Sequence, residues 1–178
     1  MEVVKPLRQL LMKSLILPCI TLVACIALLC RPTPHNPEAA KAEFTKGQEC
    51  FAVGDFIRAI GYYDRAAAHD PTYAEAHLMC GIARTRLQNR RAIPVANGYL
   101  GYAAIGIGDF DKAIEADPRY CEAYYQRGLS WEAGKYFDKA IADYTQAFEL
   151  IRAGVEPQSL AGELQERLKK LKNGTKPK

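Results

Sequence analysis

The sequence holds few of the residues from which catalytic and metal sites are built. Its three histidines, His35, His69 and His77, are scattered, and none stands with cysteine at the spacing of a zinc site. A glycine-rich loop of the kind that cradles phosphate is missing as well. Catalysis needs a convergent set of titratable groups or metal ligands. The sequence therefore predicts a non-enzymatic protein with no metal, no cofactor and no small-molecule substrate.

The excess of positive over negative charge is also small. The formal net charge is +4 over 178 residues, and Lys5, Arg8 and Lys13 belong to the N-terminal segment. A nucleic-acid-binding body would concentrate basic residues far more strongly. The composition therefore argues against nucleic acid as the partner.

Cysteine is present, with six residues, but shows no pairing pattern. Three cysteines fall in an apolar N-terminal segment and three in, or at the start of, a predicted helix: Cys19, Cys25, Cys30, Cys50, Cys80 and Cys121. Because no C-x-x-C motif occurs, we favour buried free thiols for the last three, which would act as small hydrophobes. A disulfide bridge is the alternative.

The chain does contain one pattern in three copies, at residues 54–71, 108–118 and 134–150. When the copies are aligned, small residues flank an aromatic residue, and a glycine lies upstream. The matched positions are Ala59, Gly106 and Ala140; Tyr63, Phe110 and Tyr144; Ala66, Ala113 and Ala147; and Gly47, Gly81 and Gly128. Glycine inside a helix costs about 1 kcal/mol relative to alanine. Its recurrence predicts two helices that cross closely.

The 34-residue separation of Gly47 and Gly81, the small-aromatic-small spacing and the closing Asp-Pro pair resemble the tetratricopeptide repeat (TPR). The resemblance covers residues 40–154. It implies an all-α fold in which helix-turn-helix units stack into a right-handed solenoid. The implied segments are repeat 1 at 38–73, repeat 2 at 74–120, repeat 3 at 121–154, a capping helix at 155–173 and a basic tail at 174–178.

Two units depart from the family pattern. In the second unit, 47 residues instead of 34 separate the prolines of the Asp-Pro pairs, which predicts a 13-residue insertion at 88–100, between its two helices. In the third unit, Gly134 lies one residue further from Ala140 than Gly54 lies from Ala59. The capping helix carries a leucine stripe that suits the end of a solenoid. Its members are Leu160, Leu164, Leu168 and Leu171.

The first thirty residues form a separate segment, in which a basic flank precedes seventeen uncharged residues at 14–30. This pattern is typical of an export signal or a single membrane span. We favour an uncleaved hydrophobic helix that anchors the repeats on the extracytoplasmic side, periplasmic or extracellular. A lipobox-like sequence ending in Cys25, which would be lipidated, and cleavage after Ala27 to give a secreted protein are the alternatives. Residues 31–37 form a proline-rich spacer.

In the TPR family, the first helices of successive units line a concave groove. Offsets from the three glycines give twelve matched positions: Lys41, Phe44, Gln48, Phe51, Glu75, Leu78, Ile82, Thr85, Glu122, Tyr125, Leu129 and Glu132. The apolar members would form a floor suited to a partner helix or an extended peptide. The alternative is that the capping helix or the insertion covers part of this floor.

Some relatives hold the C-terminal carboxylate of chaperones with a clamp of lysine, asparagine and arginine side chains in this groove. The matching positions of this chain are Phe44, Gln48, Met79, Glu122 and Gln126. The clamp is therefore missing, and the resemblance does not extend to that ligand.

The function predicted from these features is a protein-protein interaction scaffold, tethered to or exported across a membrane, which binds a protein partner in its groove. A different class of function competes with it. Arg86, Arg90, Arg91 and the lysine-rich tail could form an electrostatic site for an anionic membrane or nucleic acid.

Overall fold

The computed structural model describes residues 35–91, 106–155 and 157–174. These residues form only helices and the turns between them. The elements are α2 (Pro37–Ala52), α3 (Phe56–His69), α4 (Ala74–Arg91), α5 (Ile107–Ala116), α6 (Cys121–Ala133), α7 (Phe137–Arg152), a short 3₁₀ helix η1 (Gln158–Leu160) and α8 (Ala161–Gly174).

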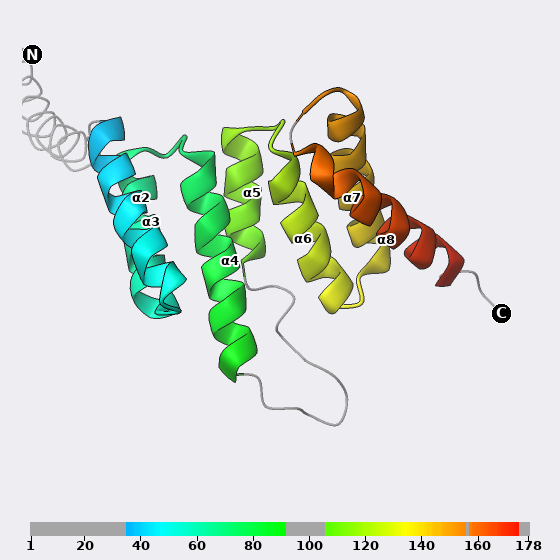
Figure 1. The fold of residues 1–178 in the computed structure, drawn as a ribbon, viewed down its shortest axis with the longest axis horizontal. Helices are drawn as coiled ribbons and strands as arrows, with labels where there is room; N and C mark the ends of the chain where they lie inside the picture. Colours follow the sequence, from blue (N-terminus) through cyan, green and yellow to red (C-terminus); the bar gives the residue numbers. More distant parts are fainter. Residues whose placement is uncertain (1–34, 92–105, 156, 175–178) are drawn as a thin grey trace, which may run out of the picture. The chain divides into compact units, whose positions relative to one another are not determined.

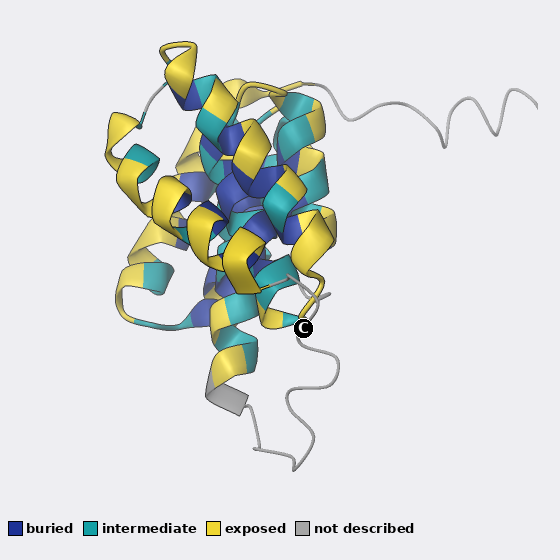
Figure 2. Ribbon diagram, turned by 90° about the vertical axis from the view of Figure 1, so that its right-hand side faces the viewer, coloured by how far each residue is buried: buried dark blue, intermediate teal, exposed yellow. Residues whose placement is uncertain are grey.

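Each helix packs against the next one along the chain, so the helices pair as antiparallel hairpins (Figure 1). We call α2 and α3 the first hairpin, α4 and α5 the second, and α6 and α7 the third. The prediction of an all-α chain with three helix-turn-helix units is confirmed. In Figure 2 the buried residues gather where the helices face one another, and the exposed residues cover their outer sides.

Short polar residues and prolines set the ends of the first hairpin. The Asn36 side chain accepts a hydrogen bond from the backbone N–H of Ala39, and Asp55 accepts one from the N–H of Arg58, both at 3.0 Å. Both are N-caps that satisfy a helix N–H which has no partner within its own helix. α3 ends at His69, because its C-cap Asp70 precedes Pro71 and has an extended backbone.

The recurring glycines lie where the two helices of each hairpin cross. A Cβ atom added to Gly47 would stand 2.6 Å from Cε1 of Tyr63, and one added to Gly128 would stand 2.5 Å from Cε1 of Tyr144. Gly81 faces Phe110 in the same way, at 2.5 Å. No side chain fits at such distances. The close crossing that the glycines predict is therefore present in all three hairpins.

The second hairpin carries the predicted insertion. α4 continues to Arg91, so the first four residues of the segment predicted at 88–100 are helical. Residues 92–105 lie outside the described part of the chain. Gly106 caps α5 with a φ of +88°, and a Cβ atom there would stand 2.8 Å from the carbonyl oxygen of Gly81. The small-residue position of this unit therefore lies at the start of its second helix and not inside it.

In the third hairpin, the displaced glycine does not occupy the left-handed position of the turn. Gly54, in the first hairpin, has a φ of +76°, and the corresponding left-handed residue in the third hairpin is Lys135, with a φ of +62°. Gly134 precedes it with an ordinary negative φ of −81°. Lys135 thus adopts a conformation that disfavours side chains, and Gly134 does not relieve it.

The third hairpin is closed by α8, which packs against α7. Leu164, Leu168 and Leu171 are buried, in a cluster that also contains Tyr125, Tyr144 and Ile151. Leu160 is partly buried against the same cluster. The predicted leucine stripe is therefore the contact face of the capping helix.

Several sequence predictions concern residues that the structure does not describe. The segment at 1–30, Cys25 within it and residues 175–178 of the basic tail all belong to this group. Among the helices that are described, none is long and apolar enough to cross a bilayer.

Candidate peptide-binding groove

The twelve predicted groove positions all lie on the first helices of the hairpins, α2, α4 and α6. Three of them are not available to a ligand. Phe44, Leu78 and Tyr125 are only 4%, 3% and 7% exposed. The apolar floor predicted from the sequence is thus largely part of the protein's own core.

A tyrosine at the start of the next unit covers the floor of the preceding one. The Phe44 ring contacts the Tyr73 ring, with centroids 5.0 Å apart, and also the Tyr63 ring, at 5.4 Å. Tyr120 packs in the cluster that contains Leu78. The sequence held a signal for this cover, because Tyr73 and Tyr120 each lie eight residues before the glycine of their unit.

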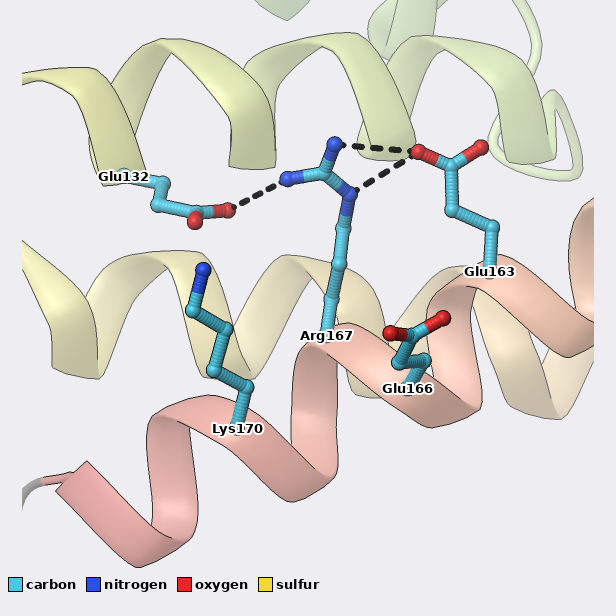
Figure 3. A pocket seen from close by; sticks show the side chains of 5 residues that line it. All are labelled: Glu132, Glu163, Glu166, Arg167 and Lys170. Carbon is cyan, nitrogen blue, oxygen red and sulfur yellow. Dashed lines mark hydrogen bonds and ion pairs between the residues drawn. The ribbon is translucent and has the colours of Figure 1, made fainter.

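In the third unit, the capping helix provides the cover. The Tyr125 hydroxyl donates a hydrogen bond of 2.5 Å to Oε1 of Glu163 on α8. Arg167, also on α8, bridges Glu163, at 3.0 Å from Nη2 to Oε1, and Glu132 on α6, at 2.9 Å from Nη1 to Oε2 (Figure 3). The capping helix is therefore held to this end of the groove by buried leucines and by a charged network.

The protonation of this network follows from its contacts. Burial, with a contribution from the bond to Glu163, raises the pKa of Tyr125 to about 12. Burial and the bond to Glu132 raise the pKa of Tyr144 as well. The hydrogen bonds from Tyr125 and Arg167 lower the pKa of the Glu163 carboxyl. Both tyrosines are thus neutral donors, and Glu163 is an ionised acceptor, at neutral pH.

What remains of the groove is mostly polar. Lys41, Gln48 and Glu75 are exposed. The partly exposed positions are Phe51, Ile82, Thr85, Glu122, Leu129 and Glu132. A ligand would therefore meet amide, carboxylate and ammonium groups, with apolar contact limited to a few side chains.

Two arginines, one on α4 and one on α6, join each of these groove helices to the second helices on either side of it. Arg127 of α6 binds Asp143 of α7, with Nη2 2.7 Å from Oδ1, and Asp111 of α5, with Nη1 2.6 Å from Oδ1. Arg84 of α4 connects Asp64 of α3 to Asp109 of α5 in the same way, at 2.9 and 3.2 Å. Sequence reasoning missed both bridges, although their carboxylates recur in the repeat. Asp64 and Asp111 directly follow the matched aromatic residue of their units, and Asp109 and Asp143 directly precede it.

The electrostatic alternative is only partly described. Arg86 is exposed, and its guanidinium carbon lies 5.0 Å from the centre of the Phe51 ring. The side chains of Arg90 and Arg91 fall outside the described part of the structure, as do residues 175–178 of the tail. An electrostatic site there stays a prediction.

The described residues contain no cluster of three histidine, cysteine or acidic side chains that could hold a metal ion. Cys50 and Cys80 are free thiols, half-buried and buried in that order, and Cys121 is buried as well. Burial raises the pKa of Cys80 to about 12, so this thiol is protonated and a poor nucleophile at neutral pH.

Comparison with known proteins yields matches in structure but none in sequence: no family profile and no curated protein matches the chain. The first TPR domain of Spaghetti (RPAP3), bound to the HSP90 peptide SRMEEVD, has a TM-score of 0.63 and 22% identity, over 78% of this chain and 94% of that one. The TPR2AB domain of yeast Sti1, in its pHSP90 complex, has a TM-score of 0.64 and 25% identity, over 77% and 48%.

A third similar structure comes from bacteria. The Yersinia enterocolitica type III secretion chaperone SycD, in complex with a peptide of the translocator YopD, has a TM-score of 0.65 and 13% identity, over 76% of this chain and 94% of that one. The chain has the tetratricopeptide-repeat fold. At these identities the likeness concerns the fold, and the ligands of these TPR proteins are not thereby ligands of this one.

Proposed function

We propose that this TPR protein is a non-enzymatic scaffold that binds a segment of another protein in the groove of α2, α4 and α6. The observation that carries the proposal is the alignment of matched positions on three successive first helices, of which α4 and α6 are joined through α5 by Arg84 and Arg127. Peptide complexes of Spaghetti and SycD, which have the same fold, support it.

The charges of the groove favour a neutral or basic partner segment with one or two apolar side chains. Glu75 is exposed and Glu122 partly exposed, so an acidic peptide such as SRMEEVD would meet like charges. Partly exposed Ile82 and Leu129 offer the apolar contacts. Phe44, which matches the first lysine position of the chaperone clamp, is buried and cannot bind a carboxylate.

Site-specific photo-crosslinking in the host cell tests the groove. A photoreactive residue at Gln48, on the groove face of α2, is expected to crosslink a discrete partner, whereas the same residue at exposed Thr145 on α7 is the matched control. Adding Ile82→Asp should abolish the Gln48 product while the helical circular dichroism is retained. Equal products at both positions, or a product that survives Ile82→Asp, would contradict binding in the groove.

We also propose that residues 1–30 tether the protein to a membrane, with the repeats on the extracytoplasmic side. The support is the uncharged run at 14–30 behind a basic flank. Fractionation of the native host, with the mass of the mature N-terminus, tests this proposal. An intact leader or a lipidated Cys25 in the membrane pool is expected. A full-length protein in the soluble cytoplasmic pool would overturn it.

A further inference from the structure

The large hydrophobic side chains that stay exposed share one edge of the repeat array. Among the described residues they are Val53 and Ile57, beside the turn from α2 to α3, and Tyr136 and Phe137, at the turn from α6 to α7. Their exposed fractions are 79%, 59%, 55% and 37%, in that order. Both turns lie at the same end of their hairpins (Figure 1). The described turns that join one hairpin to the next carry no such residue.

The α6–α7 turn differs from the α2–α3 turn in its charge. Lys135 and Lys139 flank Tyr136 and Phe137, and both lysines are exposed. Beside the α2–α3 turn, Arg58 is paired with Asp55 at 2.6 Å, and no lysine flanks Val53 or Ile57. Of the two hairpin turns that the structure describes, only the α6–α7 turn thus combines exposed aromatic rings with exposed lysines.

The end of α8 adds to this surface. A shallow cavity of about 560 Å³ is lined by Lys135, Tyr136, Phe137, Asp138, Lys139 and Gly174. Gly174 is the last residue of α8, and exposed Lys170 and Lys172 precede it by four and two residues. Asp138 is the one carboxylate among the lining residues. We call Lys135, Tyr136, Phe137 and Lys139, with the end of α8, the turn patch.

The backbone of the turn patch is strained where a glycine would be relaxed. Lys135 holds a φ of +62°, at the position that Gly54 occupies in the first hairpin. A side chain in this conformation costs about 1–2 kcal/mol. Strain of this kind is found where a side chain serves a function, and here the side chain retained is a lysine beside two exposed rings.

We propose that the turn patch docks onto the anionic surface of a phospholipid bilayer. Aromatic side chains settle at the headgroup level, and neighbouring lysines are attracted by anionic lipids. A broad bilayer surface accepts protruding rings without a preformed pocket. The patch also lies at the far end of its hairpin from the edge where the chain enters α2, a helix about 24 Å long. Contact at the patch is therefore a separate event from the proposed N-terminal tether.

The protein carries its own probe for this contact. Trp131 is the only tryptophan of the chain, and its ring centre lies 5.6 Å from that of Tyr136. Lys139 Nζ lies 4.2 Å from the centre of the Trp131 ring. Lipids with brominated acyl chains quench tryptophan fluorescence when the ring reaches the bilayer.

The test uses the full chain, reconstituted in vesicles of phosphatidylcholine alone and in vesicles that also contain phosphatidylglycerol. The measured quantity is the ratio of Trp131 emission in brominated to that in ordinary vesicles, which cancels the effect of a substitution on the emission itself. We expect quenching in the anionic vesicles, and its loss in high salt. The double variant Lys135→Gln, Lys139→Gln should fall to the level of the neutral vesicles, and so should Tyr136→Ser.

Ile57→Ser is the matched control, since Ile57 is exposed on the same edge without lysines beside it, and its ratio should equal that of the wild type. Equal quenching in neutral and anionic vesicles, or quenching that survives the double lysine variant, would overturn the proposal. A Trp131 emission shift with soluble poly-glutamate, without lipid quenching, would assign the patch to an acidic protein and would also overturn it. Co-sedimentation with neutral vesicles reports on the N-terminal tether alone, so failure of the tether is read separately.

Discussion

The first and third hairpins have the same packing but differ in the polar groups around it. In both, a tyrosine ring lies on a helical glycine, with a virtual Cβ contact of 2.6 Å for Tyr63 and 2.5 Å for Tyr144. Both rings are fully buried. The hydrophobic part of the repeat is thus copied faithfully between these two units.

The hydroxyl groups of the two tyrosines differ in their hydrogen bonding. Tyr144 donates a hydrogen bond of 2.6 Å to Oε2 of Glu132. The Tyr63 hydroxyl is buried and has no hydrogen-bond partner among the described residues. The position four residues after the glycine is Glu132 in α6 but Phe51 in α2. The third hairpin therefore joins a polar network with α8, whereas the first hairpin is held by apolar packing at the same place.

The largest expected effect comes from removing the cation of the ion pair between α6 and α7, and the equivalent change between α2 and α3 should cost far less. Arg127→Met should lower the free energy of unfolding by about 3 kcal/mol or more, because Asp143, only 8% exposed, would be left buried without its cation. Arg65→Met should cost less than about 1 kcal/mol, since Arg65 is 54% exposed. Its partner Glu43 also keeps Lys46 at 2.5 Å.

Urea unfolding followed by circular dichroism measures both changes. Equal losses for the two variants would show that burial does not separate these ion pairs. A double variant with Asp143→Leu should recover part of the Arg127→Met loss, because the unpaired carboxylate is then removed.

The second expected effect has opposite signs in the two hairpins. Tyr144→Phe should cost about 1 kcal/mol, because the hydroxyl bond to Glu132 is lost. Tyr63→Phe should be neutral or stabilising by up to about 1 kcal/mol, since it removes a buried hydroxyl whose hydrogen bond is not made. Thermal unfolding of the two single variants checks this pair, and a loss at Tyr63 as large as that at Tyr144 would reveal a partner for the Tyr63 hydroxyl.

The smallest effect concerns the turns. Lys135→Gly should stabilise the protein by roughly 1 kcal/mol, because glycine tolerates a φ of +62°. Gly54→Ala should destabilise it by a similar amount, since Gly54 has a φ of +76°. Lys135→Ala is the control that removes the charge but keeps the strain, so it should leave the stability nearly unchanged. Stabilisation by alanine equal to that by glycine would contradict the account from φ.

The sequence predicted the helices, the hairpins and the capping helix because their signals are local. Glycine at one helix position and an aromatic residue in the next helix fix where the two cross, as Gly47 and Tyr63 show. The placement of groove residues on α2, α4 and α6 followed from the same register. Binding in the groove and the membrane tether remain proposals, because the partner and the membrane are separate from the chain and its sequence does not identify them.

The exposure of the groove residues could not be predicted in the same way. Phe44 is covered by Tyr73, and Tyr125 is bonded to Glu163, 38 residues away. Such cover depends on how one unit is rotated against the next, and repeat spacing alone does not give this rotation.

By itself, the sequence determined that the chain repeats a helix pair three times and ends in an amphipathic helix, since periodic apolar positions and small residues specify local packing. Only the tertiary structure decided which polar groups meet. The Arg127 bridge to Asp111 and Asp143 and the Arg167 bridge to Glu132 join residues that lie apart in the chain. The exposed hydrophobic side chains on one edge likewise come from two hairpins, the first and the third. The contacts of both bridges arise from the angles between packed helices, which form only when the hairpins stack.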